Sequence, residues 1–142
     1  MTNQARVALI VMVVFLASCA GNSEPPSKTG VETEVFFPVH DSEDYPSAQG
    51  FGVLREVGGC LLVDDSGASA GMLPVWPEGF SFEQGTLYGQ DGSIVAVVGE
   101  SVELEGGEIT ESVFEDLTGE TIPSSCANSM PFMVGKAVRA TS

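Results

Sequence analysis

Hydrophobic residues follow two kinds of pattern along this chain. One unbroken run lies near the N-terminus, and a series of short runs separated by turn residues begins near residue 50. Short runs rich in β-branched and aromatic residues, bounded by Gly, Pro, Asn and Asp, are typical of β-strands. The pattern therefore predicts a mainly β domain, preceded by a segment of a different kind.

The first β-rich stretch is Gly52–Val63, which the pair Gly58-Gly59 divides into two apolar runs. A Gly pair inside a strand pattern marks a bulge, a bend or a tight turn. The stretch therefore predicts either one long bent strand or a hairpin. Met72–Pro77 follows, and its two prolines lack the N–H groups that a central strand donates, which predicts a short edge strand.

A second pair of strands is predicted on either side of Asp91-Gly92, a dipeptide typical of tight hairpins. Thr86–Gln90 forms the first arm. Ser93–Val98 forms the second, and because it is apolar at successive positions it is predicted to be central. Ser101–Glu105 then alternates apolar and polar residues, as a strand with one exposed face does. A last strand is predicted at Phe132–Val138.

One helix is predicted between the last two strands. Ile109, Val113 and Leu117 recur every four residues, and Gly119 follows them as a stop signal. Thr110 or Ser112 is placed to cap the start of the helix.

Several strands, one helix and one further strand suit a small closed or half-closed barrel of about five or six strands in which the helix closes one end. The OB-like barrel, the architecture that binds oligonucleotides and oligosaccharides in other proteins, is the nearest named form, and a β-sandwich is the alternative. That likeness concerns shape and implies no function.

The apolar run near the N-terminus, Val7–Leu16, follows Arg6 and ends in small residues. A positive start, an apolar stretch of this length and a small-residue exit are typical of a secretory signal peptide. The run is well short of the roughly 20 apolar residues that a membrane-spanning helix needs.

Leu16-Ala17-Ser18-Cys19 resembles the lipobox of bacterial lipoproteins. The resemblance implies that Cys19 receives a diacylglycerol and that the chain is cut before it, so that residues 1–18 are the signal peptide. The protein is then expected outside the cytoplasm, held on a bacterial membrane by this covalent lipid.

Residues 19–34 contain almost nothing to bury and have the composition of a flexible linker. Such a linker spans roughly 20 Å on average. Residues 35–142 are predicted to form a single small β domain. From about residue 50 to residue 138, the string that includes Gly59-Cys60-Leu61, Val75–Phe80 and Gly106-Gly107 resembles small secreted bacterial β-domains of no assigned function.

The charge of the chain excludes two classes of partner. There are 20 acidic and 5 basic residues, and once Arg6 is removed with the signal peptide the net charge is −16. A field of this sign repels nucleic-acid phosphates and anionic lipid head groups. We expect no nucleic-acid partner, and membrane contact only through the lipid on Cys19.

Cys60 and Cys126 remain as a pair once Cys19 is assigned to lipid. In an exported protein an even pair predicts a disulfide. A redox-active pair is the alternative, but a Cys-x-x-Cys spacing is lacking, so the structural bond is favoured.

Three sequence features are candidates for sites of chemistry. Gly67–Gly71 matches the Gly-x-Ser-x-Gly motif of hydrolases around Ser69, but prolines follow where the motif needs a helix, and the only histidine, His40, precedes it. His40 is expected to be solvated. A group of glutamates offers oxygen ligands for a divalent cation, although strand alternation favours a solvated face: Glu100, Glu103, Glu105 and Glu108.

Trp76, Phe80 and Phe82 are the candidate binding surface, for a sugar or a peptide, although packing over the core is the favoured interpretation of aromatics beside an edge strand. No catalytic residue, metal or cofactor is predicted. The function expected is that of a non-catalytic interaction or accessory module that recognises an envelope protein or wall component. The alternatives are a divalent-cation or saccharide-binding module and, least favoured, a small serine hydrolase.

Overall fold

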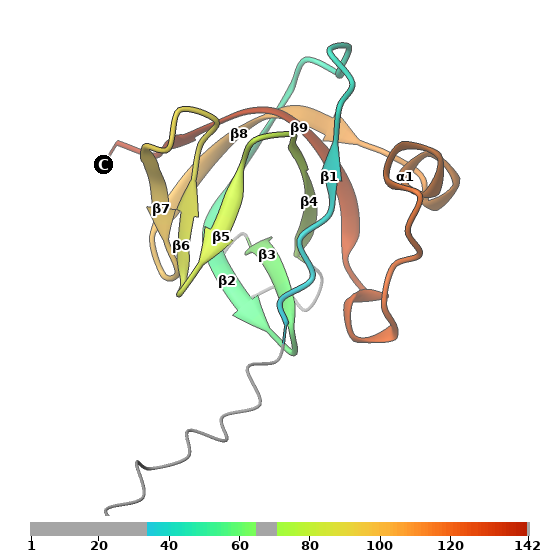
Figure 1. Ribbon diagram of the computed structural model, residues 1–142, viewed down its shortest axis with the longest axis horizontal. Coiled ribbons are helices and arrows are strands. Elements are labelled where there is room, and N and C mark those ends of the chain that lie inside the picture. The colour runs from blue at the N-terminus through green and yellow to red at the C-terminus, as the bar shows by residue number, and fades with distance from the viewer. Residues whose placement is uncertain (1–33, 65–70, 142) are drawn as a thin grey trace, which may run out of the picture. The chain divides into compact units, whose positions relative to one another are not determined.

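β-Strands make up about half of the described chain, which in this computed structural model comprises residues 34–64 and 71–141 (Figure 1). The predicted order of several strands, one helix and a last strand is confirmed. The elements are β1 (Val39–His40), β2 (Ala48–Val57), β3 (Cys60–Asp64), β4 (Met72–Pro77), β5 (Ser81–Glu83), β6 (Thr86–Tyr88), β7 (Ile94–Val97), β8 (Ser101–Glu108), α1 (Glu111–Thr118), the short 3-10 helix η1 (Ser124–Cys126) and β9 (Met130–Arg139).

Five of these strands close into a barrel. Its order is β2, β3, β4, β9 and β8, and β8 pairs with β2 again to complete the circuit. The neighbours run antiparallel except β4 and β9, which run parallel. The barrel is confirmed as the architecture, and the β-sandwich is not formed. Closure pairs strands that would otherwise be left as free edges.

The Gly58-Gly59 pair makes a tight hairpin between β2 and β3, which decides between the two predicted forms of this stretch. Both glycines have positive φ, 59° and 80°, as the two central residues of a type I′ turn must. Pairing begins directly beside the turn at Val57 and Cys60 and continues to Val53 and Asp64.

β4 is a central strand, so the prediction that Met72–Pro77 lies at an edge is wrong. Trp76 and Glu78 donate their N–H groups to the carbonyls of Pro38 and His40 (2.9 and 2.8 Å). Successive residues of a strand direct their N–H groups to opposite sides. The nitrogen of Pro74 therefore faces the side on which β1 pairs, but that pairing begins only at Trp76. The nitrogen of Pro77 faces the side on which β9 pairs, and that pairing ends at Val75. Neither proline interrupts a ladder.

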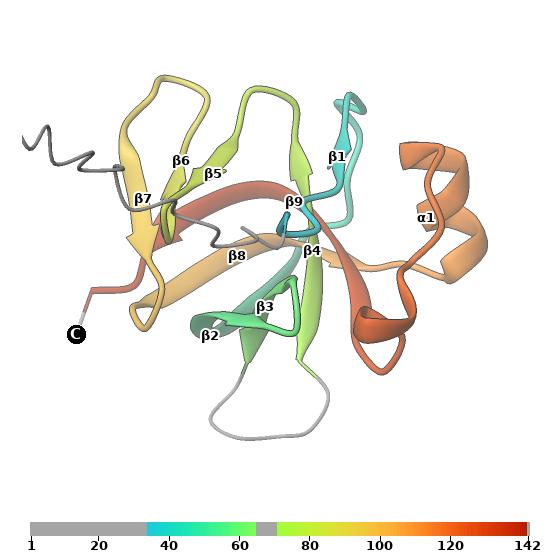
Figure 2. The same cartoon turned by 60° about the horizontal axis from the view of Figure 1, so that its bottom comes forward.

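β5, β6 and β7 form a separate three-stranded sheet, inserted between β4 and β8 (Figure 2). The hairpin predicted around Asp91-Gly92 is confirmed, since β6 pairs antiparallel with β7. The prediction that its second arm is central is wrong, because β7 is an outer strand of this small sheet. Ile94 and Val97 are accordingly 54% and 39% exposed.

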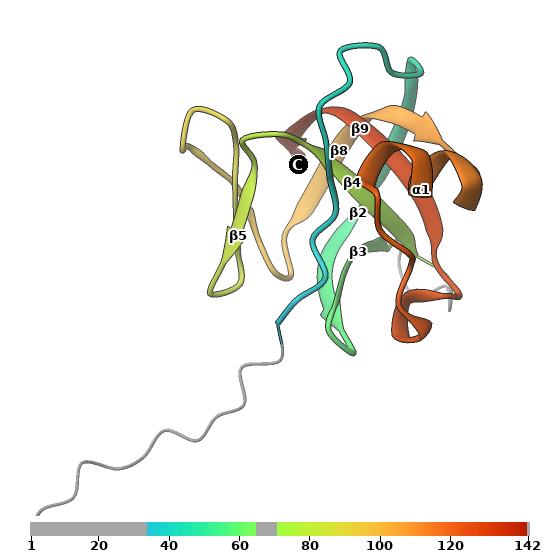
Figure 3. The ribbon, with the colours of Figure 1, turned by 45° about the vertical axis from the view of Figure 1, so that its right-hand side comes forward.

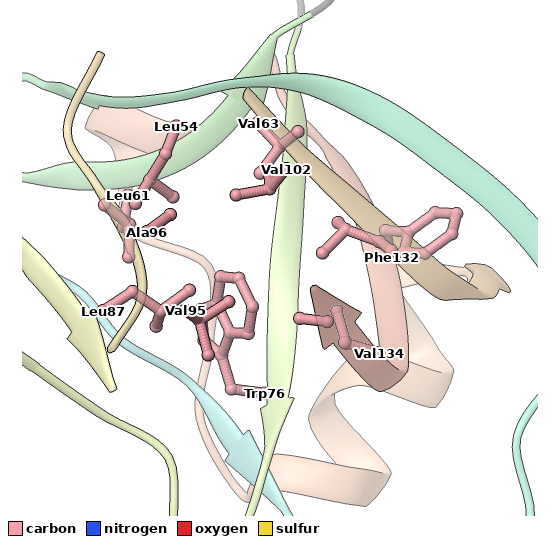
Figure 4. Packing of buried hydrophobic residues seen from close by; sticks show 12 residues of the cluster. Leu54, Leu61, Val63, Trp76, Leu87, Val95, Ala96, Val102, Phe132 and Val134 are labelled. Carbon is pink, nitrogen blue, oxygen red and sulfur yellow. The ribbon is translucent and has the colours of Figure 1, made fainter. Parts of the chain in front are cut away.

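The interior core joins the barrel to the small sheet. Leu87, Val95 and Ala96 of the small sheet belong to the same buried cluster as the barrel residues around Trp76 (Figure 4). The rest of that buried cluster comprises Leu54, Leu61, Val63, Val102, Leu104, Phe132, Val134 and Ala137. The small sheet, and not the helix, therefore shares the barrel core.

α1 has the predicted ends but buries a different residue. The Val113 N–H donates to the Thr110 hydroxyl (3.4 Å), and Gly119 ends the helix with φ 69°. Phe114 is fully buried, whereas Val113 is 41% exposed. The helix lies beside the barrel (Figure 1), where Phe114 packs on outward-facing residues of β3 and β4. Among the described residues no helix is long and apolar enough to cross a membrane.

Residues 34–40, called the strap below, fill the gap between β3 and β4 (Figure 3). β3 and β4 share only one paired position, Val63 with Met72. The Phe36 N–H donates to the Gly59 carbonyl beside β3 (2.7 Å), and the end of the strap, β1, runs parallel to β4. The strap thereby supplies hydrogen-bond partners to both strands where they part.

Candidate functional site

Four aromatic rings pack face to face where the strap meets β4 and β5. Trp76 stacks with both Phe80 and Phe37, with ring centroids 5.8 Å apart in each pair. Phe37 also stacks with Phe82, with ring centroids 6.4 Å apart. The structure therefore brings together the three aromatic residues predicted from sequence and adds Phe37, which sequence reasoning missed.

Trp76 itself is not part of any surface, so its assignment to the candidate binding surface is wrong. Its side chain is fully buried, because it projects from the central strand β4 into the core shown in Figure 4. Its indole N–H has no hydrogen-bond partner within the described residues. Trp76 supports the neighbouring rings, and Phe37, Phe80 and Phe82 are the ones that remain partly exposed.

The three partly exposed phenylalanines lie in a groove of about 960 Å³ between the strap and β5. We call it the aromatic groove. Glu34, Glu56 and Glu83 also line it, and no Lys or Arg does among the described residues. Arg55, next to Glu56 in sequence, instead forms an ion pair with Asp64 (3.6 Å). The remaining lining residues are Val35, Ser81, Gln84 and Gly85.

A tight turn holds one end of the groove. Gln84 and Gly85 join β5 to β6 with φ values of 49° and 78°, and Glu83 pairs directly with Thr86. Two successive positive φ values define a type I′ turn, whose twist matches that of the strands it joins. The turn therefore fixes the register of β5 against β6, and with it the positions of the β5 side chains.

His40 occupies a second, smaller pocket of about 310 Å³. The prediction that it is solvated is wrong: its side chain is 3% exposed, and Nε2 lies 2.7 Å from the Val134 carbonyl oxygen. Nε2 must therefore carry the proton and donate it. Nδ1 has no protein partner in the part of the chain that the structure describes. Asp41, Glu43 and Glu78 give this pocket an acidic rim.

The predicted pairing of Cys60 with Cys126 is confirmed. The two residues are 66 positions apart, their Cα atoms are separated by 5.8 Å, and their sulfurs are at bonding distance. Both are buried in the cluster that contains Phe114. The disulfide thus fastens η1, and with it the connection from α1 to β9, onto β3.

The glutamates around β8 do not converge on one point. Glu100 accepts a hydrogen bond from the Val97 N–H (2.9 Å) and pairs with Arg139 (3.0 Å), while Glu105 is opposite Lys136 on β9. Across residues 34–64 and 71–141, no group of three or more His, Cys, Asp or Glu residues is placed to hold a metal ion.

Two predicted sites lie outside the described residues. These are Cys19 with the rest of its tetrapeptide, and Ser69 with most of its glycine-rich motif. The chain matches no protein-family model, no curated protein and no solved structure.

Proposed function

We propose that the protein is a lipid-anchored lipoprotein of a bacterial cell envelope, and that its barrel is a non-catalytic binding module. The aromatic groove is its binding surface. The partner is a protein or a wall component close to the membrane.

The observation that carries this proposal is the aromatic groove itself. Ligand sites are concave, lined by apolar and aromatic side chains with a few polar groups, and measure about 300–1,000 Å³. The groove, at about 960 Å³, is within this size range, and four of its ten lining residues are apolar or aromatic beside five polar or charged ones. Its rings are already ordered by stacking on Trp76 and on each other, so binding costs little side-chain entropy.

The proposed location at the membrane rests on the Leu16–Cys19 tetrapeptide and the apolar run before it. Two acyl chains on one cysteine hold a protein stably on a bilayer, whereas a single chain gives only marginal binding. The acidic domain is repelled by anionic head groups, so the lipid on Cys19 is the attachment and the domain remains free to meet its partner.

The anchor is tested by intact-mass measurement and thiol counting on protein from a detergent-soluble membrane fraction, compared with a Cys19→Ser variant. We expect wild type to start at Cys19 with added diacylglycerol, and the variant to lose the lipid and leave the membrane. Unmodified wild-type protein in the soluble fraction would contradict the anchor.

The binding surface is tested in cells with a photo-crosslinking amino acid at Gln84, at the end of the aromatic groove, and at Glu115 on α1 as the matched control. Crosslinked products are expected from position 84 and not from position 115. Equal products from both positions, or none from position 84, would remove the groove as the binding surface.

A saccharide is the second candidate ligand, because exposed ring faces stack on sugars and carboxylates accept hydrogen bonds from hydroxyl groups. Both kinds of group line the aromatic groove. The divalent-cation alternative has less support, since Glu100 is engaged by Arg139 and Glu105 is opposite Lys136.

A further inference from the structure

We propose that the aromatic groove binds an extended peptide segment that carries Lys or Arg, and that this segment adds as a strand to the outer edge of β5. This inference rests on the proposed function, because it names the ligand class of the same groove.

The negative charge of the residues that line the groove favours a cationic ligand. Three carboxylates and no Lys or Arg line the groove within the described chain. All three carboxylates are exposed, so their attraction for a cation is that of surface charges and strengthens only where a bound peptide excludes water from the groove. An anionic or wholly apolar ligand would instead desolvate these carboxylates without compensation.

The phenylalanine rings narrow the kind of cation. The face of an aromatic ring attracts a guanidinium or ammonium group placed within about 6 Å of its centroid. Lys and Arg also carry apolar stems that pack on such rings while the charged head reaches a carboxylate. Phe80 and Phe82, which each stack on a single neighbouring ring, offer the ring contact, and the three glutamates of the groove offer the carboxylate contact.

The backbone of β5 indicates an extended peptide. β5 is an outer strand whose only paired neighbour in the described structure is β6, and all three of its residues line the groove. An outer strand presents unpaired N–H and C=O groups to an added strand. Peptides that bind by strand addition gain affinity from these backbone hydrogen bonds and specificity from pockets for alternate side chains.

The test must separate the groove from the general attraction of an acidic protein for cations. The purified full-length protein in nonionic detergent is titrated calorimetrically with a short capped peptide that alternates Arg and Val, and with the matching Glu-Val peptide. The variants are Glu56→Gln with Glu83→Gln in the groove, and Glu111→Gln with Glu115→Gln on α1 as a control of equal charge change.

We expect the Arg-Val peptide to bind and the Glu-Val peptide not to bind. The groove double variant should weaken binding by about tenfold or more, and the α1 double variant by less than about twofold. N-methylation of every peptide bond should abolish binding, because it removes the backbone donors on both edges of the peptide that strand addition needs. Glutamine preserves the shape of each side chain, and unchanged thermal unfolding verifies that the variants are folded.

If both double variants weaken peptide binding equally, the binding reflects only the general attraction of an acidic protein for a cation, and the proposal is overturned. Undiminished binding of the N-methylated peptide would overturn strand addition. Binding of an uncharged N-acetylglucosamine oligomer, with no binding of the Arg-Val peptide, would assign the groove to saccharides. If crosslinking from position 84 persists while the peptide does not bind, the groove remains a binding surface and only the ligand class is wrong.

Discussion

Gly106 shows how strictly single positions of this barrel are constrained. It lies at the irregularity in the pairing of β8 with β9, and a Cβ atom there would overlap the Met133 carbonyl oxygen. Since that oxygen belongs to the backbone, the strand would have to move. Gly106→Ala is expected to lower the free energy of unfolding by about 3 kcal/mol, as measured by chemical denaturation. Gly89→Ala, whose added methyl meets nothing closer than 3.4 Å, is the control, and equal losses would contradict the explanation.

Asp91 gives a residue-scale prediction about pH. Its Oδ1 accepts hydrogen bonds from the Ser93 hydroxyl (2.6 Å) and the Ser93 N–H (3.0 Å). These bonds, the hydroxyl first, hold the pKa of Asp91 below its usual 3.8. Because the ionised form is the one favoured, their support of the turn is fully present above that usual pKa and is lost as the pH falls through the lowered pKa. Ser93→Ala should move the pKa back up in an NMR titration of the carboxyl group, and an unmoved pKa would contradict this cause.

His40 and Trp76 show why single-residue environments were mispredicted. His40 is a lone histidine without the Cys and His spacings of a metal site, and the sequence predicts it to be solvated. Its burial comes from Val134, 94 positions away, which lies on β9. The prolines on either side of Trp76 predict an edge strand, yet their missing N–H groups face sides on which β4 makes no ladder bond at those positions. Both outcomes depend on contacts that no local pattern contains.

At the scale of elements, the attachment of α1 depends on Phe114. This side chain is fully buried against the outward-facing residues of β3 and β4. Phe114→Ala is expected to cost about 3–5 kcal/mol of stability in denaturant unfolding, because it leaves a cavity. Val113→Ala, one residue earlier and 41% exposed, should cost far less. A larger loss for Val113→Ala would mean that the helix buries the predicted face after all.

The disulfide makes a second prediction at this scale. It closes a loop of 66 residues between β3 and η1, and restricting the unfolded chain over such a loop contributes about 4 kcal/mol on the chain-entropy estimate. Replacing Cys60 and Cys126 together by Ala should lower the denaturation midpoint accordingly. Reduction of the wild-type protein should produce a similar shift, and a midpoint insensitive to reductant would contradict the assigned role.

Elements with local signals were predictable, and their partners were not. The α1 boundaries follow from Thr110 and Gly119, and the hairpin before β7 follows from Asp91-Gly92, because caps and turns are decided by adjacent residues. The sequence predicts β4 at an edge and β7 at a central position, whereas β4 is a central strand and β7 is an outer strand. Those positions depend on pairing with β1 and β9, and on the small sheet ending at β7, none of which is encoded nearby in the chain.

At the scale of the whole molecule, the aromatic groove is assembled from three separate parts of the chain. The strap supplies Phe37, the end of β2 supplies Glu56, and β5 with its turn supplies Phe82 and Glu83. Sequence reasoning found Phe80 and Phe82 because they lie near Trp76 in the chain. It missed Phe37 and the carboxylates, because only barrel closure brings the strap beside β5.

The strap also determines how the domain responds to load. A pull on the chain ahead of Glu34 is carried first by the hydrogen bonds from Phe36 to Gly59 and from Trp76 to Pro38. Extracting the strap would leave β3 and β4 joined only by their single pair, Val63 with Met72, and would remove Phe37 from the aromatic groove. On the proposed anchor at Cys19 and the proposed binding role of the groove, the tether and the binding surface are mechanically in series, so a ligand that contacts Phe37 would raise the force at which the domain unfolds.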